Sequence, residues 1–213
     1  MSWLNNLKVA QKLALLISVL IIALVCVSGT GYYFLKKTNN NVEAMYNESL
    51  TTVHLITENR VHARRIEANL FSLMLTTNDA ENQALLAEIS KRAKAFDENL
   101  TKVESMQLPD SERAQLKEIR DTLAKYRAVR TDVLALAAAN KNAEAYALYK
   151  EKAEVHSLKF TELLTQFGET QVRKAAQMRD NSANDFSQAT VTFIALALAA
   201  TFIGLFLGVL IIK

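Results

Sequence analysis

The chain has 213 residues, of which half are hydrophobic, and its formal net charge at pH 7 is +3. This charge is too small and too dispersed to favour nucleic-acid binding, and the single cysteine, Cys26, excludes an internal disulfide and any cysteine-based metal motif. Charged residues are almost confined to positions 36–185, so the average composition hides a strong segregation along the chain.

Two uncharged apolar runs, 13–35 and 191–212, lie near the two ends. Each is about 22 residues long, and a helix needs about 20 apolar residues to cross the hydrocarbon core of a bilayer. We therefore expect two transmembrane helices that enclose an extracytoplasmic domain at 36–190, with residues 1–12 as a cytoplasmic tail. Lysines flank the first run on both sides, so the preference of positive charges for the cytoplasmic side does not fix the orientation of this run. A long domain is translocated largely regardless of its charge, which favours an outside location for 36–190. We expect Trp3 to lie at the membrane interface.

The first run also fits a cleavable signal peptide. Lys8 and Lys12 supply a positive start, and small residues at 27–29 suit a cleavage site. The run, however, stays apolar through Leu35, well beyond the apolar core of a signal peptide. The pattern favours an uncleaved span.

Segment 36–190 contains one proline, Pro109, and one glycine, Gly168, which favours long helices. Three polar breaks divide it into four segments: 76–79, 108–111 and 140–142. In each segment apolar residues recur at spacings of three and four, as in helices packed side by side. Because short connections make neighbouring helices antiparallel, the sequence predicts an all-α fold, an up-down-up-down four-helix bundle. We expect its first and last helices to be continuous with the two transmembrane helices.

The breaks carry residues that commonly cap helices. Asn78, with Glu81 three residues later, predicts a capping box. Pro109 predicts the end of one helix, and residues 110–111 predict the N-cap of the next. The third break, 140–142, has two asparagines, which suit a left-handed C-terminal position and an N-cap.

Polar residues interrupt the apolar seams. Ser49, Thr52 and Asn59 lie on the seam of the first helix, which predicts a surface shared between the subunits of a homodimer. Beyond Gly168, polar residues also fill seam positions of the last helix. That segment is either a solvated stalk near the membrane or a mobile, dimer-facing segment.

The layout of span, bundle and span, with Asn-Leu-Lys-Val-Ala-Gln-Lys-Leu at 6–13 ahead of the first span, resembles the four-helix-bundle sensory domain of methyl-accepting chemotaxis proteins. This domain also occurs on histidine kinases and diguanylate cyclases. The resemblance implies a homodimeric sensor in the inner membrane that binds a small molecule between subunits near its membrane-distal end. Binding is then expected to shift the last helix and its span along their axis.

Chemoreceptors continue past the second span into a HAMP module and a long cytoplasmic hairpin, whereas this chain ends at Lys213. We expect either the sensory part of a longer receptor or a sensor whose output lies in another chain. The expected function is the transmembrane sensory module of a bacterial chemoreceptor. The alternatives are the sensor of a histidine kinase or diguanylate cyclase, and a membrane-anchored adaptor that binds a partner protein.

Arg60, Arg64 and Arg65 form the densest positive group of the domain. Arg60 and Arg64 share a helical face, where like charges repel and a bound anion relieves the repulsion. The resemblance extends to the R-x4-R-x3-R spacing with which aspartate-type chemoreceptors hold their ligand: Arg60 and Arg65 fit the first interval, and Asn69 replaces the last arginine. The predicted signal is a small carboxylate, bound directly or through a periplasmic binding protein. The alternative is a solvated face balanced by acidic neighbours.

Three further residues complete the candidate site. Arg130 falls on the apolar seam of the third helix, where an unpaired guanidinium is costly, so it must find a carboxylate, reach solvent or hold a ligand. Tyr146 and Tyr149 begin the last helix, at the end where the resemblance implies ligand contacts. Filling the core is the alternative role of both tyrosines.

His54, Glu58 and His62 share one helical stripe, which suits a divalent ion or a pH sensor, although a solvated face is the simpler interpretation. The sequence contains no phosphate-binding loop, nucleophile elbow or Cys/His pair. We therefore expect no enzyme activity, no cofactor and no bound metal.

Overall fold

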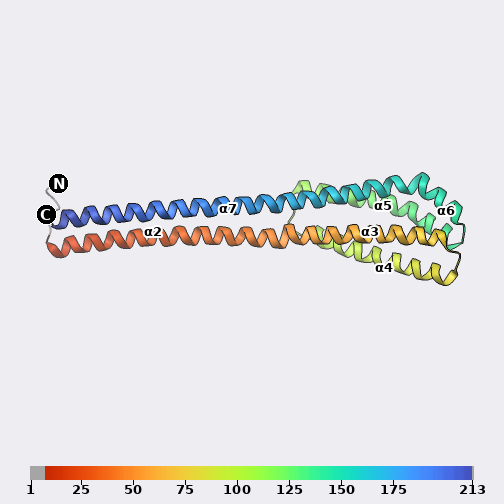
Figure 1. Ribbon diagram of the computed structural model, residues 1–213, viewed down its shortest axis with the longest axis horizontal. Coiled ribbons are helices and arrows are strands. Elements are labelled where there is room, and N and C mark those ends of the chain that lie inside the picture. Colours follow the sequence, from red (N-terminus) through yellow and green to blue (C-terminus); the bar gives the residue numbers. More distant parts are fainter. Residues whose placement is uncertain (1–7, 213) are drawn as a thin grey trace. The chain divides into compact units, whose positions relative to one another are not determined.

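The computed structural model describes the backbone of residues 8–212 and the side chains of residues 8–209, so Trp3 and the first two residues of the 6–13 motif lie outside the described residues. Every regular element in the described part is helical. In chain order the elements are α2 (Val9–Ala44), the π-helical turn η1 (Met45–Leu50), α3 (Thr51–Leu75), α4 (Asp79–Glu104), α5 (Asp110–Ala138), α6 (Asn142–Leu148), the π-helical turn η2 (Tyr149–Ala153) and α7 (Glu154–Ile212) (Figure 1). The all-α prediction is confirmed.

The chain forms two compact units. The first contains α2 and the part of α7 from Gln177 onward. The second runs from Met45 to Ala176 and contains the bundle.

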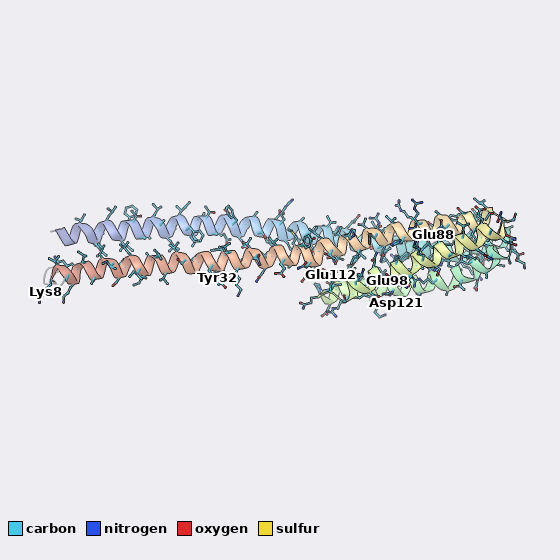
Figure 2. All side chains as sticks on the ribbon, turned by 90° about the horizontal axis from the view of Figure 1, so that it is seen from below. Lys8, Tyr32, Glu88, Glu98, Glu112 and Asp121 are labelled. Atoms are coloured by element: carbon cyan, nitrogen blue, oxygen red, sulfur yellow. The ribbon has the colours of Figure 1, made fainter. Side chains whose placement is uncertain are left out.

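In the first unit, α2 and the C-terminal part of α7 lie side by side and antiparallel (Figures 1 and 2). Lys37 forms an ion pair with Asp185 at 2.7 Å, and the ring of Phe193 lies so close to Gly31 that a Cβ there would be 3.4 Å from it. Both helices are long and apolar enough to cross a membrane, and their most apolar windows are not buried at all. A core helix of a soluble domain would bury this surface, whereas a lipid-facing helix leaves it exposed.

In the second unit, α3, α4, α5 and the segment from α6 through η2 into α7 lie side by side as the four helices of a bundle (Figure 1). Exposed charged side chains such as Glu98 on α4 and Asp121 on α5 stand on its outer faces (Figure 2). Its largest fully buried apolar side chains are Ile56, Leu70, Leu73, Phe96, Leu100, Ile119, Leu164 and Phe167. The predicted four-helix bundle is confirmed.

The first connection is capped much as predicted. The side-chain oxygen of Asn78 accepts hydrogen bonds from the backbone N–H groups of Ala80 at 3.0 Å and Glu81 at 3.2 Å. The Glu81 carboxylate, however, accepts from the Thr76 hydroxyl at 2.7 Å, and that hydroxyl in turn accepts from the backbone N–H of Asn78 at 3.2 Å. Thr76 therefore takes the place that a capping box gives to the glutamate.

At the second connection the predicted cap is wrong by one residue. Pro109 itself precedes the first turn of α5, and its carbonyl accepts from the N–H groups of Glu112 and Arg113, both at 3.0 Å. The fixed φ of proline suits the start of a helix, and Asp110 then enters the first turn, where a negative charge is favourable.

The third connection contains the left-handed residue that the sequence predicts. Asn140 has φ 59°, and it is the single non-glycine residue with positive φ in the described part of the chain. Asn142 is not an N-cap, contrary to the prediction. It is the first residue of α6, and its side-chain amide donates to the carbonyl of Thr76 at 3.0 Å, which ties the last helix to the first connection.

The polar seam residues of η1 and α3 are buried within one chain. Ser49, Thr52 and Asn59 are all 0 % exposed, so the prediction that they form a surface between subunits is wrong. Two of them have partners in neighbouring segments: the Thr52 hydroxyl donates to the sulfur of Met106, in the α4–α5 connection, at 3.1 Å, and the Asn59 amide donates to a carbonyl of α4 at 3.2 Å. Polar side chains are tolerated in a core when such partners exist.

Candidate functional site

A cavity of about 120 Å³ lies within the bundle, and all four helical segments line it. Its walls combine apolar and charged side chains, which is the usual composition of a small-molecule site. The lining residues are Ala63, Arg64, Ile66 and Glu67 of α3, Phe96 of α4, Leu123, Tyr126, Arg127 and Arg130 of α5, and Ser157, Leu158, Phe160 and Thr161 of α7.

Arg130 is the most deeply buried cation at this cavity, with 9 % of its surface exposed. Its guanidinium carbon lies 5.5 Å from the centre of the Tyr126 ring, a cation–π contact. Its Nε has no hydrogen-bond partner, and no described carboxylate lies within 4.0 Å of the guanidinium. Burial lowers the pKa of Arg130, and the neighbouring Tyr126 opposes this shift.

The other two cavity arginines are in different electrostatic positions. Arg127 pairs with Asp97 at 2.9 Å, and Asp97 also pairs with Arg120 at 3.2 Å. Arg64 is exposed to solvent, where water screens its charge. Arg130 is therefore a buried positive charge that forms no ion pair with a described carboxylate, although Asp97 acts on it at longer range and Glu67 lines the same cavity.

Glu67 lines the same cavity and is held by two hydroxyl groups. Its carboxylate accepts a short hydrogen bond from Tyr149 and a second one, at 3.1 Å, from Ser157. Burial and the hydrogen bond to Glu67 raise the pKa of the Tyr149 phenol, so the phenol stays protonated and keeps donating. The π-helical turn η2 begins at Tyr149, whose ring also meets that of Phe71 edge-on at 5.0 Å.

The helical periodicity explains why these groups meet. Glu67 follows Ala63 by four residues and Ile66 by one, and Leu70 comes three residues later, so all four lie on the inward face of α3. On α5, Tyr126 and Arg130 are separated by four residues and share a face in the same way. Small residues at Ala63 and Ser157 leave the space that the cavity occupies.

A family model described as a four helix bundle sensory module for signal transduction matches residues 6–186. The chain belongs to this family. No curated protein and no solved structure matches the sequence of this chain significantly. The match covers the bundle and the whole of α2, so the suspected chemotaxis-type sensory domain is confirmed at the level of the family.

Within this sensory module the structure brings some of the predicted ligand residues together. Arg64 and Arg130 line the one cavity, and Tyr149 reaches it through the Glu67 carboxylate. The predicted repulsion between Arg60 and Arg64 has no role there, because Arg60 lines a separate groove of about 270 Å³ beside Gly168.

The remaining predicted residues lie away from the cavity. Arg65 is exposed and Asn69 is half-buried, and neither lines a described pocket. Tyr146 is 52 % exposed and stands beside Phe71 in a shallow apolar hollow at the far end of the bundle. A site built on the R-x4-R-x3-R spacing is therefore not assembled within one chain.

Sequence reasoning missed Glu67, Ser157 and Arg127 as cavity residues. Glu67 is one of the acidic neighbours that balance the arginines in the alternative interpretation of a solvated face, although its spacing from Ile66 and Leu70 gives an inward position. Ser157 lies one residue after His156, which falls on the apolar seam when the seam is read from the sequence, so a shift of one residue hides Ser157. No comparable signal marks Arg127, because its inward reach depends on Asp97 of another helix.

The histidine stripe is exposed at His54 and Glu58, whereas His62 is half-buried and its Nδ1 has no hydrogen-bond partner among the described residues. His54 lies 3.6 Å from Glu58, both are largely exposed, and Glu58 also accepts from the side-chain amide of Asn99 at 3.1 Å. In the described part of the chain no cluster of three or more potential metal ligands is present.

Proposed function

We propose that this chain is the transmembrane sensory module of a bacterial chemoreceptor. It lies in the inner membrane with two spans and both termini in the cytoplasm, and its bundle faces the outside of the cell. There it detects a small carboxylate, directly or through a periplasmic binding protein, and the event is transmitted through the last helix. Two copies form the working unit, as the resemblance implies.

The observation that carries this proposal is the combination of a sensory bundle of known family with two unburied apolar helices at its ends. A sensory module must sample one side of a membrane and report on the other, and this arrangement along the chain suits that task. The buried charge of Arg130 in an internal cavity supports an anionic signal.

A chimeric receptor tests the proposal. Residues 1–213 are fused to the HAMP module and cytoplasmic hairpin of a chemoreceptor of known output, in cells without their own chemoreceptors. Kinase activity is recorded while small carboxylates, and their neutral amides as controls, are added. We expect at least one carboxylate to change kinase activity and its amide to have no effect. A folded, membrane-inserted chimera that ignores every compound would contradict the sensory proposal and favour an adaptor that binds a partner protein.

A further inference from the structure

We infer that the bundle cavity is a binding site, complete within one chain, for a small monocarboxylate with an apolar body, held by the guanidinium of Arg130. This inference rests on the proposed function only where it takes the bound molecule to be the signal. The site itself follows from the charges, walls and size of the cavity.

The charge of the site calls for one anion. Arg130 is 9 % exposed, its Nε has no partner, and no described carboxylate approaches its guanidinium within 4.0 Å. A buried cation without a counter-ion is strongly unfavourable, and a carboxylate beside a guanidinium forms the charge-assisted hydrogen bonds that remove the cost. Arg127 does not compete for the ligand, because Asp97 already pairs with it.

The walls select an apolar body. Phe96, Leu123 and Phe160 contribute buried hydrophobic surface to the cavity. Its volume of about 120 Å³ is somewhat below that of an engineered cavity of roughly 150 Å³ that accepts benzene. The space therefore suits a short branched aliphatic chain, and an aromatic ring that carries a carboxylate marks the upper limit of size.

Glu67 limits the ligand to one carboxylate. Its own carboxylate lines the cavity, and Oε1 of this carboxylate accepts from the hydroxyl groups of both Tyr149 and Ser157. A second ligand carboxylate would meet this negative charge in a poorly hydrated space, where like charges repel strongly. Because both Glu67 hydrogen bonds come from the protein, the site needs no ammonium group from the ligand.

The cavity is accessible from the surface of the same chain. Two of its lining residues, Arg64 of α3 and Leu158 of α7, are exposed, so it opens between these helices. An exposed arginine at the opening also attracts anions from solution. No second subunit is required to complete the walls or to supply a charge.

Titration calorimetry on the full chain in lipid nanodiscs tests the inference, with 4-methylpentanoate and benzoate as probes. Arg130→Met keeps an unbranched apolar stem and removes the guanidinium with its charge. We expect it to weaken binding of the tighter probe by about 10- to 100-fold, the loss of one charge-assisted contact. The control is Lys117→Met on the same helix, whose ammonium group pairs with the exposed Asp121 and does not line the cavity; its affinity stays within about twofold of wild type.

Two features of the design keep the result interpretable. Partition of the probes into lipid is the same for wild type and Arg130→Met, so their difference reports the site alone. Arg130→Met removes a buried charge without a counter-ion, so its thermal midpoint is expected to stay equal to or above that of wild type. Arg130→Lys, which keeps the charge but loses the planar fork, also binds more weakly.

The remaining outcomes are decisive in either direction. Weaker binding of 4-methylpentanamide and of 3-methylglutarate than of 4-methylpentanoate supports the single-carboxylate site. Equal binding by wild type and Arg130→Met, or no binding of either probe at millimolar concentration, overturns it. Tighter binding of leucine than of 4-methylpentanoate also overturns it, because Glu67 would then recognise an ammonium group. Binding in nanodiscs with a silent chimeric receptor would instead leave the site intact and contradict the sensory proposal.

Discussion

Buried polar side chains in this bundle differ in how well they are satisfied. Glu67 is held by two hydroxyl groups from the last helical segment, which fixes α3 against that segment. Gln171, by contrast, is 0 % exposed and neither atom of its amide has a hydrogen-bond partner. Unsatisfied amides weaken a core, and satisfied carboxylates strengthen it. The Tyr149–Glu67 contact is therefore the residue-scale interaction whose removal is most informative.

Tyr149→Phe removes the hydroxyl that donates to Glu67 and keeps the ring. We expect a loss of about 1.5–3 kcal/mol in the free energy of unfolding, because the acceptor is charged and one hydrogen bond from Ser157 remains. The measurement is thermal unfolding of the full chain in detergent, followed by circular dichroism. Tyr146→Phe is the control, since Tyr146 is 52 % exposed; its effect should stay below about 0.5 kcal/mol. Equal effects of the two substitutions would contradict the importance of the contact.

The same tyrosine gives a pH dependence with a defined sign. Its pKa is raised in the folded protein, chiefly by burial, above the ordinary value of 10.0. The folded state therefore holds the phenolic proton more tightly than the unfolded state does, and this stability is fully present below pH 10 and is lost as the pH rises further. Between roughly pH 8 and roughly pH 11, wild type should lose more stability than Tyr149→Phe. Parallel losses would show that other groups dominate.

At the scale of elements, the sequence predicted the helices better than their ends. The number of bundle helices and the positions of the three breaks follow from apolar periodicity and from scarce glycine and proline, which are local properties. The cap at Pro109 and the role of Asn142 depend on which neighbouring carbonyl or hydroxyl is available in the folded chain. The π-helical turn at Tyr149 has no sequence signature, and it shifts the last helix from the regular spacing used to place Tyr146 and Tyr149.

The candidate site was predictable only in part for the same reason. The position of Arg130 on an apolar seam is a local fact, and it indicated an unusual environment correctly. Glu67 and Ser157, which complete the site, lie on different helices and are 90 residues apart in the sequence. Which seam positions face a cavity depends on side-chain volumes across four helices, and no single helix specifies them.

Asn140 connects the α5–α6 turn to the start of α4. It adopts φ 59°, and its side-chain oxygen accepts from the Asn82 amide at 3.0 Å. Asn140→Gly tolerates the φ and loses the hydrogen bond, which costs about 0.5–1.5 kcal/mol of unfolding free energy. Asn140→Ala loses the same hydrogen bond and costs about 1–2 kcal/mol more than Asn140→Gly, because a left-handed backbone is unfavourable for a residue with a Cβ. Asn140→Asp keeps an acceptor and should change least.

Thermal unfolding of the three Asn140 variants gives the measurement. The expected order of midpoints is Asp above Gly above Ala. An alanine variant as stable as the glycine variant would mean that the turn relaxes to a negative φ in solution, and that the left-handed backbone does not limit its stability.

At the scale of the whole molecule, the proposed function requires the bundle and the chain ends to lie on opposite sides of the membrane. The first unit supplies two apolar helices that are long enough to span a membrane and whose apolar surfaces are exposed. The Lys37–Asp185 ion pair joins these helices beyond the apolar runs, where charged side chains are compatible with the lipid–water interface. The predicted topology follows from these features and from the length of the intervening domain.

Cysteine labelling tests this topology, because Cys26 is the single native cysteine. In a Cys26→Ser background, cysteines replace Glu98, on the outer face of α4 (Figure 2), or Lys8, ahead of the first apolar run. We expect a membrane-impermeant maleimide to label position 98 on intact spheroplasts and position 8 only after permeabilisation. Asp121, equally exposed at the surface of α5, serves as a second outer position that must behave as position 98 does. Labelling of position 8 on intact spheroplasts would contradict the prediction that the N-terminus lies in the cytoplasm. A mature chain that lacks this position would identify the first run as a cleaved signal peptide.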